Sequence, residues 1–234
     1  MQKLSHRNSG YALLKGQGLE IGALDAPAPV PARCVVEYCD AVSKEEAASV
    51  YSEVNSEHFV DVEYVCDLDT KGLSIFSTEN FDFVILNHVI EHVANPIRVI
   101  EELFRVTRPG GLVIVSAPDK TFTYDKNRNL TSFEHLQIEY EMNVTESSDD
   151  HYVEFLRGVH PHVFNHPDID QLLPEHVEHA KGRREHVHVW DSDSFADFLR
   201  RTLAVLGIEA ECLFESTGQE NRYEHFSVWK KCRE

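Results

Sequence analysis

Four apolar runs in the first half of the chain each end in acidic or polar residues that could bind a nucleoside. A glycine follows the first run, at Gly22, and an acid ends the second run, at Asp40. Asp40 follows Gly22 at close to the offset of roughly 20 residues at which an acid accepts the ribose hydroxyls of a nucleotide. The alternative is that Asp40 only ends a strand. The polar residues at the four ends are Glu20 and Gly22, Asp40, Asp67, and the pair Asn87 and His88.

No phosphate-binding loop accompanies these residues. The pattern G-x-G-x-x-G is absent from the chain, and so is the P-loop pattern with its lysine. Both patterns bring backbone N–H groups to the phosphates of a nucleotide. We therefore expect a nucleoside that is bound without a pyrophosphate, which argues against NAD and ATP.

Extended and helical patterns alternate in the first half of the chain, which is typical of a parallel sheet with crossover helices. Asn95 is expected to cap a helix with Pro96 at its first position, where a missing N–H costs nothing. Right-handed crossovers would place the polar strand ends on one edge of the sheet, where such sheets bind ligands. The expected strands are 18–22, 34–40, 62–67, 81–86 and 112–117, and the expected helices are 44–54 and the one from Asn95 to about 108.

Residues 119–185 interrupt this pattern. They are polar and rich in charge and histidine, with one short helix expected to be capped at Thr131 and to end near Glu141. We interpret this segment as a lid that is inserted over the site.

The sheet pattern resumes after the lid and completes one α/β domain. The later elements are an expected strand at 186–190, a helix that ends at Gly207, and two strands at 211–216 and 225–230. The predicted architecture is a mostly parallel, seven-stranded sheet with an antiparallel end, although eight segments have a strand-like pattern. The predicted organisation is a core of residues 1–118 and 186–234, with the lid at 119–185.

Charge and cysteine content exclude several classes of protein. Lys+Arg number 22 and Asp+Glu 40, which gives a formal net charge of −18. This excess disfavours binding to nucleic acid or anionic lipid, whose phosphates must be neutralised by cations. The five cysteines form no CxxC pair, so we expect reduced thiols and no cysteine-based zinc site. No signal segment or membrane span is expected, and we expect a cytoplasmic protein.

Two stretches together resemble class I S-adenosylmethionine-dependent methyltransferases. They are Phe81–His92, which reads FDFVILNHVIEH, and Arg108–Ser116, which reads RPGGLVIVS. The polar strand ends named above precede and accompany them in the order typical of that family. The resemblance covers about residues 17–118 and, more weakly, 186–234. It implies a Rossmann-like methyltransferase fold with helices on both faces of the sheet.

Further motifs resemble a bacterial subgroup of these enzymes that is often found with glycosyltransferases. They are LEIGALDAPAP from Leu19 to Pro29, APDKTFTYD from Ala117 to Asp125, and EHL from Glu134. The resemblance implies O-methylation of a sugar or glycan precursor, so the expected partner is a saccharide or another small-molecule acceptor.

The family resemblance also implies which residues hold the amino-acid end of S-adenosylmethionine. Glu20 would orient the methionine ammonium, and the backbone of Gly22, Ala23 and Leu24 would wrap around the amino-acid portion. The first loop departs from the family pattern because its usual second and third glycines are Leu24 and Ala26 here. The loop must therefore follow a different path.

The adenosine end of the cofactor would meet a second group of residues. By the same resemblance, Asp40 would hold the ribose hydroxyls, and Asp67 with Leu68 would meet the adenine. Asn87 and His88 would lie beneath the sulfonium.

Methyl transfer from a sulfonium mainly requires that the nucleophile be aligned behind the methyl group, and a sugar hydroxyl also needs a proton acceptor. His88, at the end of the fourth strand, is the first candidate for this base. Asp119 could orient the acceptor or act as a base, and His186 and His188 would project from one face of a strand. The structural alternatives are a backbone-bonded His88 and a solvated strand edge at 186–190. Candidate acceptor contacts in the lid are Tyr124, Asp125, His135 and His151.

Two other functions remain open from the sequence. His88-x-x-Glu91-His92 matches the inverted zinc-protease pattern, which needs both histidines on one helical face. The helix expected at Asn95 leaves room for barely one or two turns, so zinc hydrolysis is a remote alternative. With the first loop altered, the chain could also be a catalytically inactive S-adenosylmethionine-binding or interaction protein.

The lid histidines raise the question of a metal. Eight of the 14 histidines lie between His151 and His188, and imidazoles with neighbouring acids could bind a divalent ion. Their spacings match no compact ligand motif, so we predict a solvated polar lid and no metal site. The sequence does not predict an oligomeric state.

Overall fold

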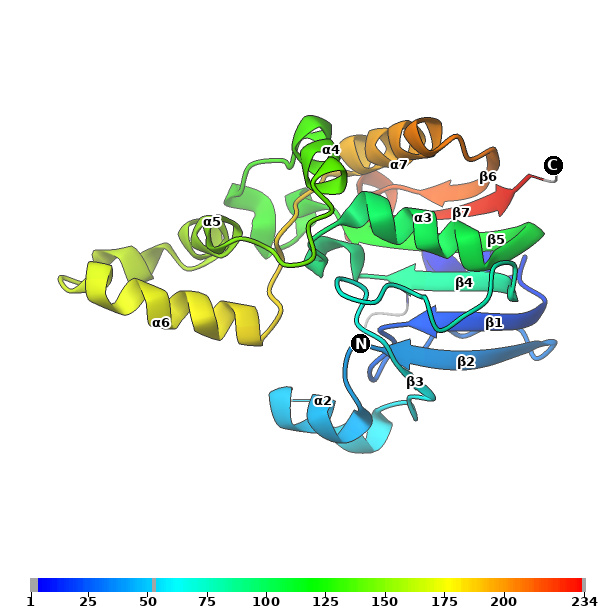
Figure 1. Ribbon diagram of the computed structural model, residues 1–234, viewed down its shortest axis with the longest axis horizontal. Coiled ribbons are helices and arrows are strands. Elements are labelled where there is room, and N and C mark those ends of the chain that lie inside the picture. Colours follow the sequence, from blue (N-terminus) through cyan, green and yellow to red (C-terminus); the bar gives the residue numbers. More distant parts are fainter. Residues whose placement is uncertain (1–3, 52–53, 233–234) are drawn as a thin grey trace.

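The computed structural model describes residues 4–51 and 54–232, and its centre is one sheet of seven strands (Figure 1). The strand order is β3-β2-β1-β4-β5-β7-β6, and all pairs are parallel except the two that β7 makes with β5 and β6. The predicted sheet with an antiparallel end is confirmed. The strands are β1 (Gly16–Ile21), β2 (Cys34–Asp40), β3 (Tyr64–Val65), β4 (Phe81–Asn87), β5 (Thr107–Pro118), β6 (Ala210–Ser216) and β7 (Glu224–Lys231).

Strand β4 is buried on both faces, as its composition predicts. Phe81, Phe83, Val84, Ile85 and Leu86 are all fully buried, which is typical of a parallel strand that is covered on both sides. The chain runs outward from β1 to β2 and β3 and then returns to β4 on the other side of β1. This reversal is a topological switch point, outside which open α/β sheets bind their ligands.

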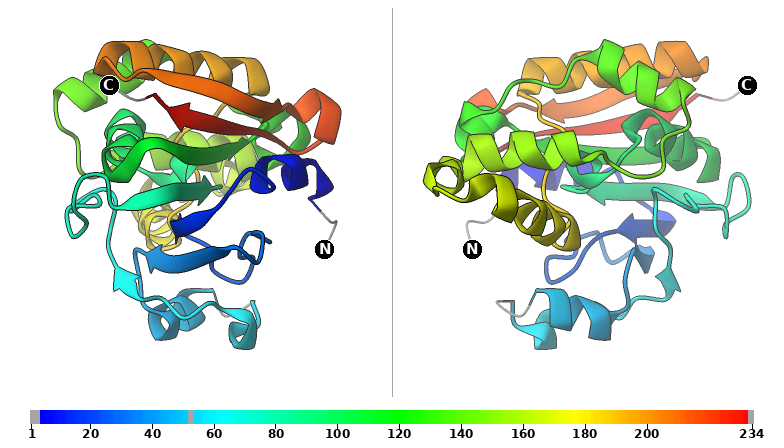
Figure 2. Two further views of the ribbon diagram at one scale, coloured as in Figure 1. Left: turned by 90° about the vertical axis from the view of Figure 1, so that its right-hand side faces the viewer. Right: turned by 60° about the vertical axis from the view of Figure 1, so that its left-hand side comes forward.

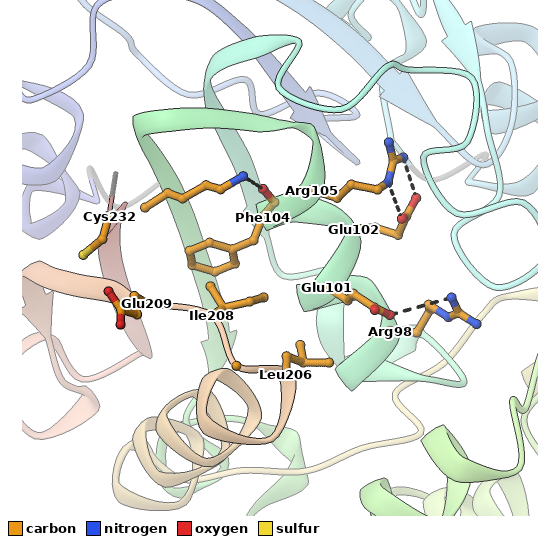
Figure 3. Close-up of a pocket in the computed structure, with 11 residues that line it drawn as sticks. Arg98, Glu101, Glu102, Phe104, Arg105, Leu206, Ile208, Glu209 and Cys232 are labelled. Atoms are coloured by element: carbon orange, nitrogen blue, oxygen red, sulfur yellow. Dashed lines mark hydrogen bonds and ion pairs between the residues drawn. The ribbon is translucent and has the colours of Figure 1, made fainter. Parts of the chain in front are cut away.

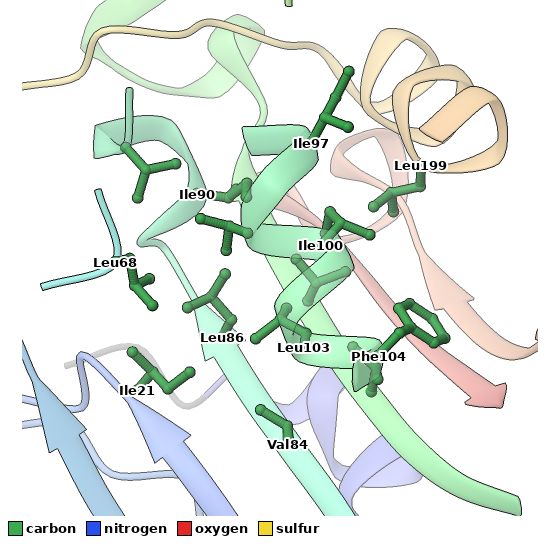
Figure 4. Packing of buried hydrophobic residues seen from close by; sticks show 14 of the residues in the cluster. Ile21, Leu68, Val84, Leu86, Ile90, Ile97, Ile100, Leu103, Phe104 and Leu199 are labelled. Atoms are coloured by element: carbon green, nitrogen blue, oxygen red, sulfur yellow. The ribbon is translucent and has the colours of Figure 1, made fainter. Parts of the chain in front are cut away.

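Helices α3 (Pro96–Val106) and α7 (Ser192–Leu206) cover one face of the sheet. Asn95 caps α3 as predicted, and Asp191 caps α7. Helix α7 ends at Gly207, whose φ of 66° lies in the left-handed region that glycine adopts without strain. Figure 4 shows the apolar side chains of α3 packed between β4 and α7. Those labelled are Ile97, Ile100, Leu103 and Phe104.

The N-terminal segment covers the opposite face of the sheet. It contains the short helices η1 (Ser5–Arg7) and α1 (Asn8–Tyr11), which lie beside the sheet in Figure 2. Tyr11 and Ala28 pack here with Phe83, in a cluster separate from that beneath α3. Helices therefore lie on both faces, although those of the second face have only one turn each.

The elements beside β2 are shorter than the sequence predicts. Helix α2 (Lys44–Val50) begins with the predicted capping box of Ser43 and Glu46. It ends before residue 54, and residues 52–53 of the expected helix lie outside the described part. Strand β3 has two residues where 62–67 were expected. The remaining short elements outside 119–185 are η2 (Ser56–His58), η3 (Ile90–His92) and α8 (Gly218–Asn221).

The 119–185 segment is more helical than the sequence predicts. It projects beyond the carboxyl ends of β1, β2 and β4 (Figure 1), and its two longest helices pack together around Tyr152, Phe155 and Val177. Ser132, not Thr131, caps the predicted helix. The elements are η4 (Lys120–Phe122), η5 (Tyr124–Asn127), α4 (Phe133–Glu141), α5 (Asp149–Val159), η6 (Pro161–Asn165) and α6 (Ile169–Gly182). None of the helices that the structure describes is long and apolar enough to cross a membrane.

The prediction of a strand at 186–190 is wrong, because no strand forms there. Strand β7 occupies the position next to β5 that such a strand would need, and only a single bridge joins Trp190 to Asp119. The backbone N–H groups of Val187 and His188 both donate to the carbonyl of Glu91. The segment therefore connects 119–185 to α7 without joining the sheet, and its two histidines belong to separate groups of side chains.

Candidate functional site

A cavity of about 300 Å³ lies at the switch point, outside the carboxyl ends of β1, β2 and β4. Gly22 and Leu24 from the first loop, Asp40, Leu68 and His88 line it together. The structure thus brings together five of the nine residues that the sequence assigned to the cofactor. The other lining residues are Ile21, Ala41, Tyr51, Cys66, Asp69, Val89, His92, Val93, Arg183, Arg184 and Glu185.

A larger pocket of about 710 Å³ lies elsewhere, beside α3 and the end of α7 (Figure 3). Four of its charged side chains form two ion pairs, Arg105 with Glu102 and Arg98 with Glu101. It contains none of the polar residues at the ends of the first four strands. The cavity at the switch point is therefore the candidate functional site.

The first loop of the cavity requires glycine at position 22. Gly22 has a φ of 71°, and a Cβ there would lie 2.4 Å from Cγ2 of Val89. Leu24, which replaces a family glycine, also has a positive φ of 47°. Its carbonyl accepts the N–H of Val60, which anchors the altered loop.

Glu20 is buried behind this loop and does not line the cavity. Both of its carboxylate oxygens lie near the N–H of Ala28, at 3.0 and 3.1 Å. Burial raises the pKa of the Glu20 carboxyl to about 7. In this structure Glu20 fixes the proline-rich loop, and its role toward a methionine ammonium stays a prediction. Ala23 is buried and does not line the cavity either.

The acid at the end of β2 reaches the cavity, whereas the acid after β3 does not. Asp40 lines the cavity and accepts the N–H of Ala41 at 2.7 Å, and burial raises the pKa of its carboxyl. Asp67 instead pairs with Arg184, whose Nη2 lies 2.5 Å from Oδ2. Burial acts to raise the pKa of Asp67, but this guanidinium outweighs it and the pKa is lowered.

Asp69 is a cavity residue that the sequence analysis missed. It accepts the N–H of Ala94 at 2.7 Å, and burial raises the pKa of its carboxyl to about 6. The sequence does contain a signal for Asp69. It lies two residues after Asp67, and two such residues point to the same side of the chain if the segment is extended.

His88 lines the cavity and is held from behind by a buried acid. Its φ is 54°, its Nε2 lies 2.7 Å from Oε2 of Glu224, and its ring stacks on Tyr223. Arg7 and His6 also donate to Glu224. Burial acts to raise the pKa of Glu224, but these donors outweigh it and hold the pKa far below its usual range.

Asn87 lies outside the cavity. Its amide donates to the hydroxyl of Tyr11 at 3.0 Å and accepts the hydroxyl of Ser116 at 3.0 Å. Asn87 therefore joins the end of β4 to its neighbours and gives no contact to the cavity in this structure.

A second group of polar side chains adjoins the cavity at His92. The ring of His186 meets that of His92 edge-on, with centroids 4.6 Å apart. His186 Nδ1 lies 2.7 Å from Oδ2 of Asp125, and its Nε2 lies 2.7 Å from the hydroxyl of Tyr124. A carboxylate that holds one nitrogen of an imidazole fixes its tautomer and leaves the other nitrogen as a proton acceptor.

The predicted acceptor residues fall into two separate groups. Tyr124 and Asp125 join His186 beside the cavity, whereas His135 and His151 lie with His188 and Glu139 in another cluster. That second cluster lines no part of the cavity.

Asp119 is not placed for catalysis. It is completely buried, and its carboxylate accepts the N–H and the hydroxyl of Ser192 and the N–H of Thr121. The base role predicted for it has no support, because these donors tie the end of β5 to the start of α7. The inverted zinc-protease arrangement is also absent, since η3 begins only at Ile90 and His88 points to Glu224.

The sheet order with an antiparallel β7 defines a Rossmann-like domain, and its switch-point cavity, which carries an acid from β2, is in the position where such sheets bind ligands. Residues 3–202 match the family described as "Methyltransferase domain", and the chain belongs to that family.

Known proteins show the following similarities. A "Probable S-adenosylmethionine-dependent methyltransferase" of Mycolicibacterium smegmatis is 31% identical over 134 residues, which is 56% of this chain and 48% of that protein. An "Uncharacterized methyltransferase" of Mycolicibacterium vanbaalenii is 46% identical over 41 residues, or 18% of this chain and 16% of its own length. The chain thus matches half or less of these relatives. A Rhodobacter sphaeroides structure titled "Putative Zn-dependent Alcohol Dehydrogenases" has a TM-score of 0.53 at 15% identity, covers 96% of this chain and 88% of its own, and shows a shared fold alone.

Proposed function

We propose that this chain is an S-adenosylmethionine-dependent methyltransferase that methylates an oxygen of a sugar or glycan precursor. The observation that carries the proposal is the cavity itself, in which Gly22, Asp40, Leu68 and His88 meet at the switch point of a chain that belongs to the methyltransferase domain family. The absence of a phosphate loop supports a cofactor that is a nucleoside without phosphates.

The residues of the cavity fit S-adenosylmethionine. Gly22 allows the first loop to turn beside the cavity with a positive φ, where any side chain would collide with Val89. Asp40 would accept the ribose hydroxyls, and the apolar side chains of Leu68 and Val93 would contact the adenine. When bound, the cofactor would supply a sulfonium methyl group for transfer.

His186 is the base that we propose for the acceptor hydroxyl. Asp125 holds Nδ1, so Nε2 is the proton-accepting atom, and its present partner is the Tyr124 hydroxyl. A tyrosine hydroxyl ionises only at about pH 10, so Tyr124 keeps its proton at neutral pH and donates a hydrogen bond to Nε2. An acceptor hydroxyl that replaces or joins this donor would lose its proton to His186 as the methyl group is transferred.

His88 takes a different part in this proposal. Its Nε2 is bound to Glu224 and its ring is stacked, so it is fixed as a wall of the cavity. We propose that it positions the reacting end of the cofactor, as the family resemblance implies. The 119–185 segment serves as the lid, because Arg184 at its end lines the cavity.

The sugar acceptor rests on the subgroup motifs and on charge. A chain with a net charge of −18 suits an uncharged or weakly charged acceptor better than a polyanion. Sugars offer hydroxyls whose methylation requires a base, which the His186–Asp125 pair would provide.

Calorimetry with S-adenosylhomocysteine tests the cofactor site. Asp40→Asn should weaken binding at least tenfold, about 1.4 kcal/mol, whereas Asp170→Asn, at an exposed position on α6, should leave it unchanged. Equal affinity of the wild type and Asp40→Asn would overturn the ribose assignment. No binding to the wild type would overturn the cofactor and favour an interaction protein.

Transfer of labelled methyl groups to a panel of nucleotide sugars and lipid-linked saccharides tests the reaction. His186→Gln should lower kcat by roughly 100-fold, which is typical of a lost general base, and should leave S-adenosylhomocysteine affinity unchanged. His179→Gln, on the exposed side of α6, is the matched control. If His88→Ala abolishes turnover at unchanged cofactor affinity while His186→Gln retains it, the base is His88.

A further inference from the structure

Four metal-binding side chains meet at one point outside the cofactor cavity. His135 and Glu139 come from α4, His151 from α5, and His188 from the connection to α7. One donor atom from each lies within 4.8 Å of all the others. The spacing of His135 and Glu139, four residues apart, places both on the same face of the helix.

The distances within this cluster match those around a small cation. His135 Nε2 lies 3.0 Å from Oε1 of Glu139 and 3.0 Å from Nε2 of His151, which in turn lies 3.3 Å from the same Oε1. His188 Nε2 lies 3.7 Å from Oε2 of Glu139. A tetrahedral zinc ion with bonds of roughly 2.0–2.1 Å separates its ligand atoms by about 3.3 Å.

Hydrogen bonds alone do not satisfy the cluster. His188 is 1% exposed, and in the described part of the chain neither of its ring nitrogens makes a hydrogen bond of normal geometry. Oε2 of Glu139 is also buried without a partner. Buried polar atoms in native proteins nearly always have a partner, so these atoms point to a missing ligand. If His135 and His151 both donated to Glu139, their two N–H groups would also repel each other.

We propose that His135, Glu139, His151 and His188 together bind one zinc ion. Three imidazoles and a carboxylate form a ligand set that suits zinc, and four protein ligands leave no open position. The site is therefore structural and not catalytic. Ser148 supports it from outside, since its hydroxyl lies 3.1 Å from Nδ1 of His151 and can fix that ring.

The ion would join the 119–185 segment to the rest of the chain. It would cross-link α4, α5 and the connection to α7, where His188 lies two residues after the proposed base His186. The other group of possible ligands, Glu91, His92 and His186, has three donors, and His186 is already bound to Asp125 and Tyr124. Both carboxylate oxygens of Glu91 are also buried without a hydrogen-bond partner in the described part of the chain, but this group offers one donor fewer than the cluster around His188.

Zinc titration of the full chain after dialysis against a chelator tests the site, with no methyl cofactor present. The wild type should bind one equivalent of zinc by calorimetry, and Co²⁺ should give the visible absorption of a tetrahedral centre. His151→Ala and Glu139→Gln should each weaken zinc binding at least tenfold. The control His179→Ala, at an exposed histidine of α6, should bind as the wild type does.

Two outcomes would overturn the site. One is a wild type that takes up no zinc, and the other is unchanged zinc affinity in both His151→Ala and Glu139→Gln. Because these measurements need only the wild type, the three variants, the metal and circular dichroism to verify folding, they remain decisive if the methyltransferase proposal fails.

Discussion

Replacement of Glu20 by Gln should abolish one component of the pH dependence of stability. Glu20 is 2% exposed, and burial raises the pKa of its carboxyl from 4.5 to about 7. Below pH 4.5 the folded and unfolded states both hold the proton. Between pH 4.5 and 7 the unfolded state ionises while the folded state stays protonated, so stability falls as the pH rises.

The size of this effect follows from the two pKa values. At 1.36 kcal/mol per pH unit, a carboxyl whose pKa rises from 4.5 to about 7 costs the folded state about 3 kcal/mol by pH 8. Gln at position 20 carries no charge at any of these pH values, and its carbonyl can still accept the N–H of Ala28. The variant therefore lacks this penalty.

Urea unfolding of the wild type and Glu20→Gln at pH 4.5, 6, 7 and 8 measures the effect. Other titrating groups, such as Asp69, contribute to both proteins, so the difference between their unfolding free energies isolates Glu20. We expect the difference to change by about 3 kcal/mol in favour of the variant between pH 4.5 and 8. Parallel stability curves would refute the reasoning, since they would mean that Glu20 ionises in the folded state as it does in the unfolded one.

Three further perturbations test the rest of the site. Glu224→Gln leaves the buried Arg7 guanidinium without its counter-charge and should cost about 3–5 kcal/mol in the free energy of urea unfolding; a loss below 1 kcal/mol would contradict a buried pair. Gly22→Ala should destabilise by at least about 1–2 kcal/mol because of its positive φ, with the collision with Val89 added, and an unchanged melting temperature would count against the loop geometry. Arg184→Ala removes one wall of the cavity and should weaken S-adenosylhomocysteine binding roughly fivefold, about 1 kcal/mol in calorimetry. Tighter binding would show that the carboxylate of Asp67, freed from Arg184, contacts the ligand in place of the arginine.

The sequence predicts the elements whose determinants are local. Asn95 and Pro96 specify the start of α3 because a cap and a first-turn proline act within one turn. The run Phe81–Leu86 specifies a central strand because its bulky residues need burial on both faces. Both predictions depend on neighbours in the sequence, and both are confirmed.

The errors and omissions concern partners that are distant in the sequence. Glu224 forms a hydrogen bond with His88 and follows it by 136 residues. Arg184 forms an ion pair with Asp67 and follows it by 117 residues. No spacing rule connects such pairs, because tertiary contacts alone bring them together. The strand expected at 186–190 fails for a related reason: alternating valines are equally compatible with a connection that is buried between two parts of the chain.

The connection between α6 and α7 provides several contacts on which the candidate site depends. Arg184 pairs with Asp67, His186 with Asp125, and His188 lies with the proposed zinc ligands, so three residues within a stretch of five reach three different places. Arg184 itself lies in a turn, with a φ of 50°. A shift of the backbone by one residue would therefore break all three contacts at once. Fixing His188 with a metal ion would set the position of the proposed base and of the cavity wall together, which gives a structural zinc ion a functional role without any contact to the reacting atoms.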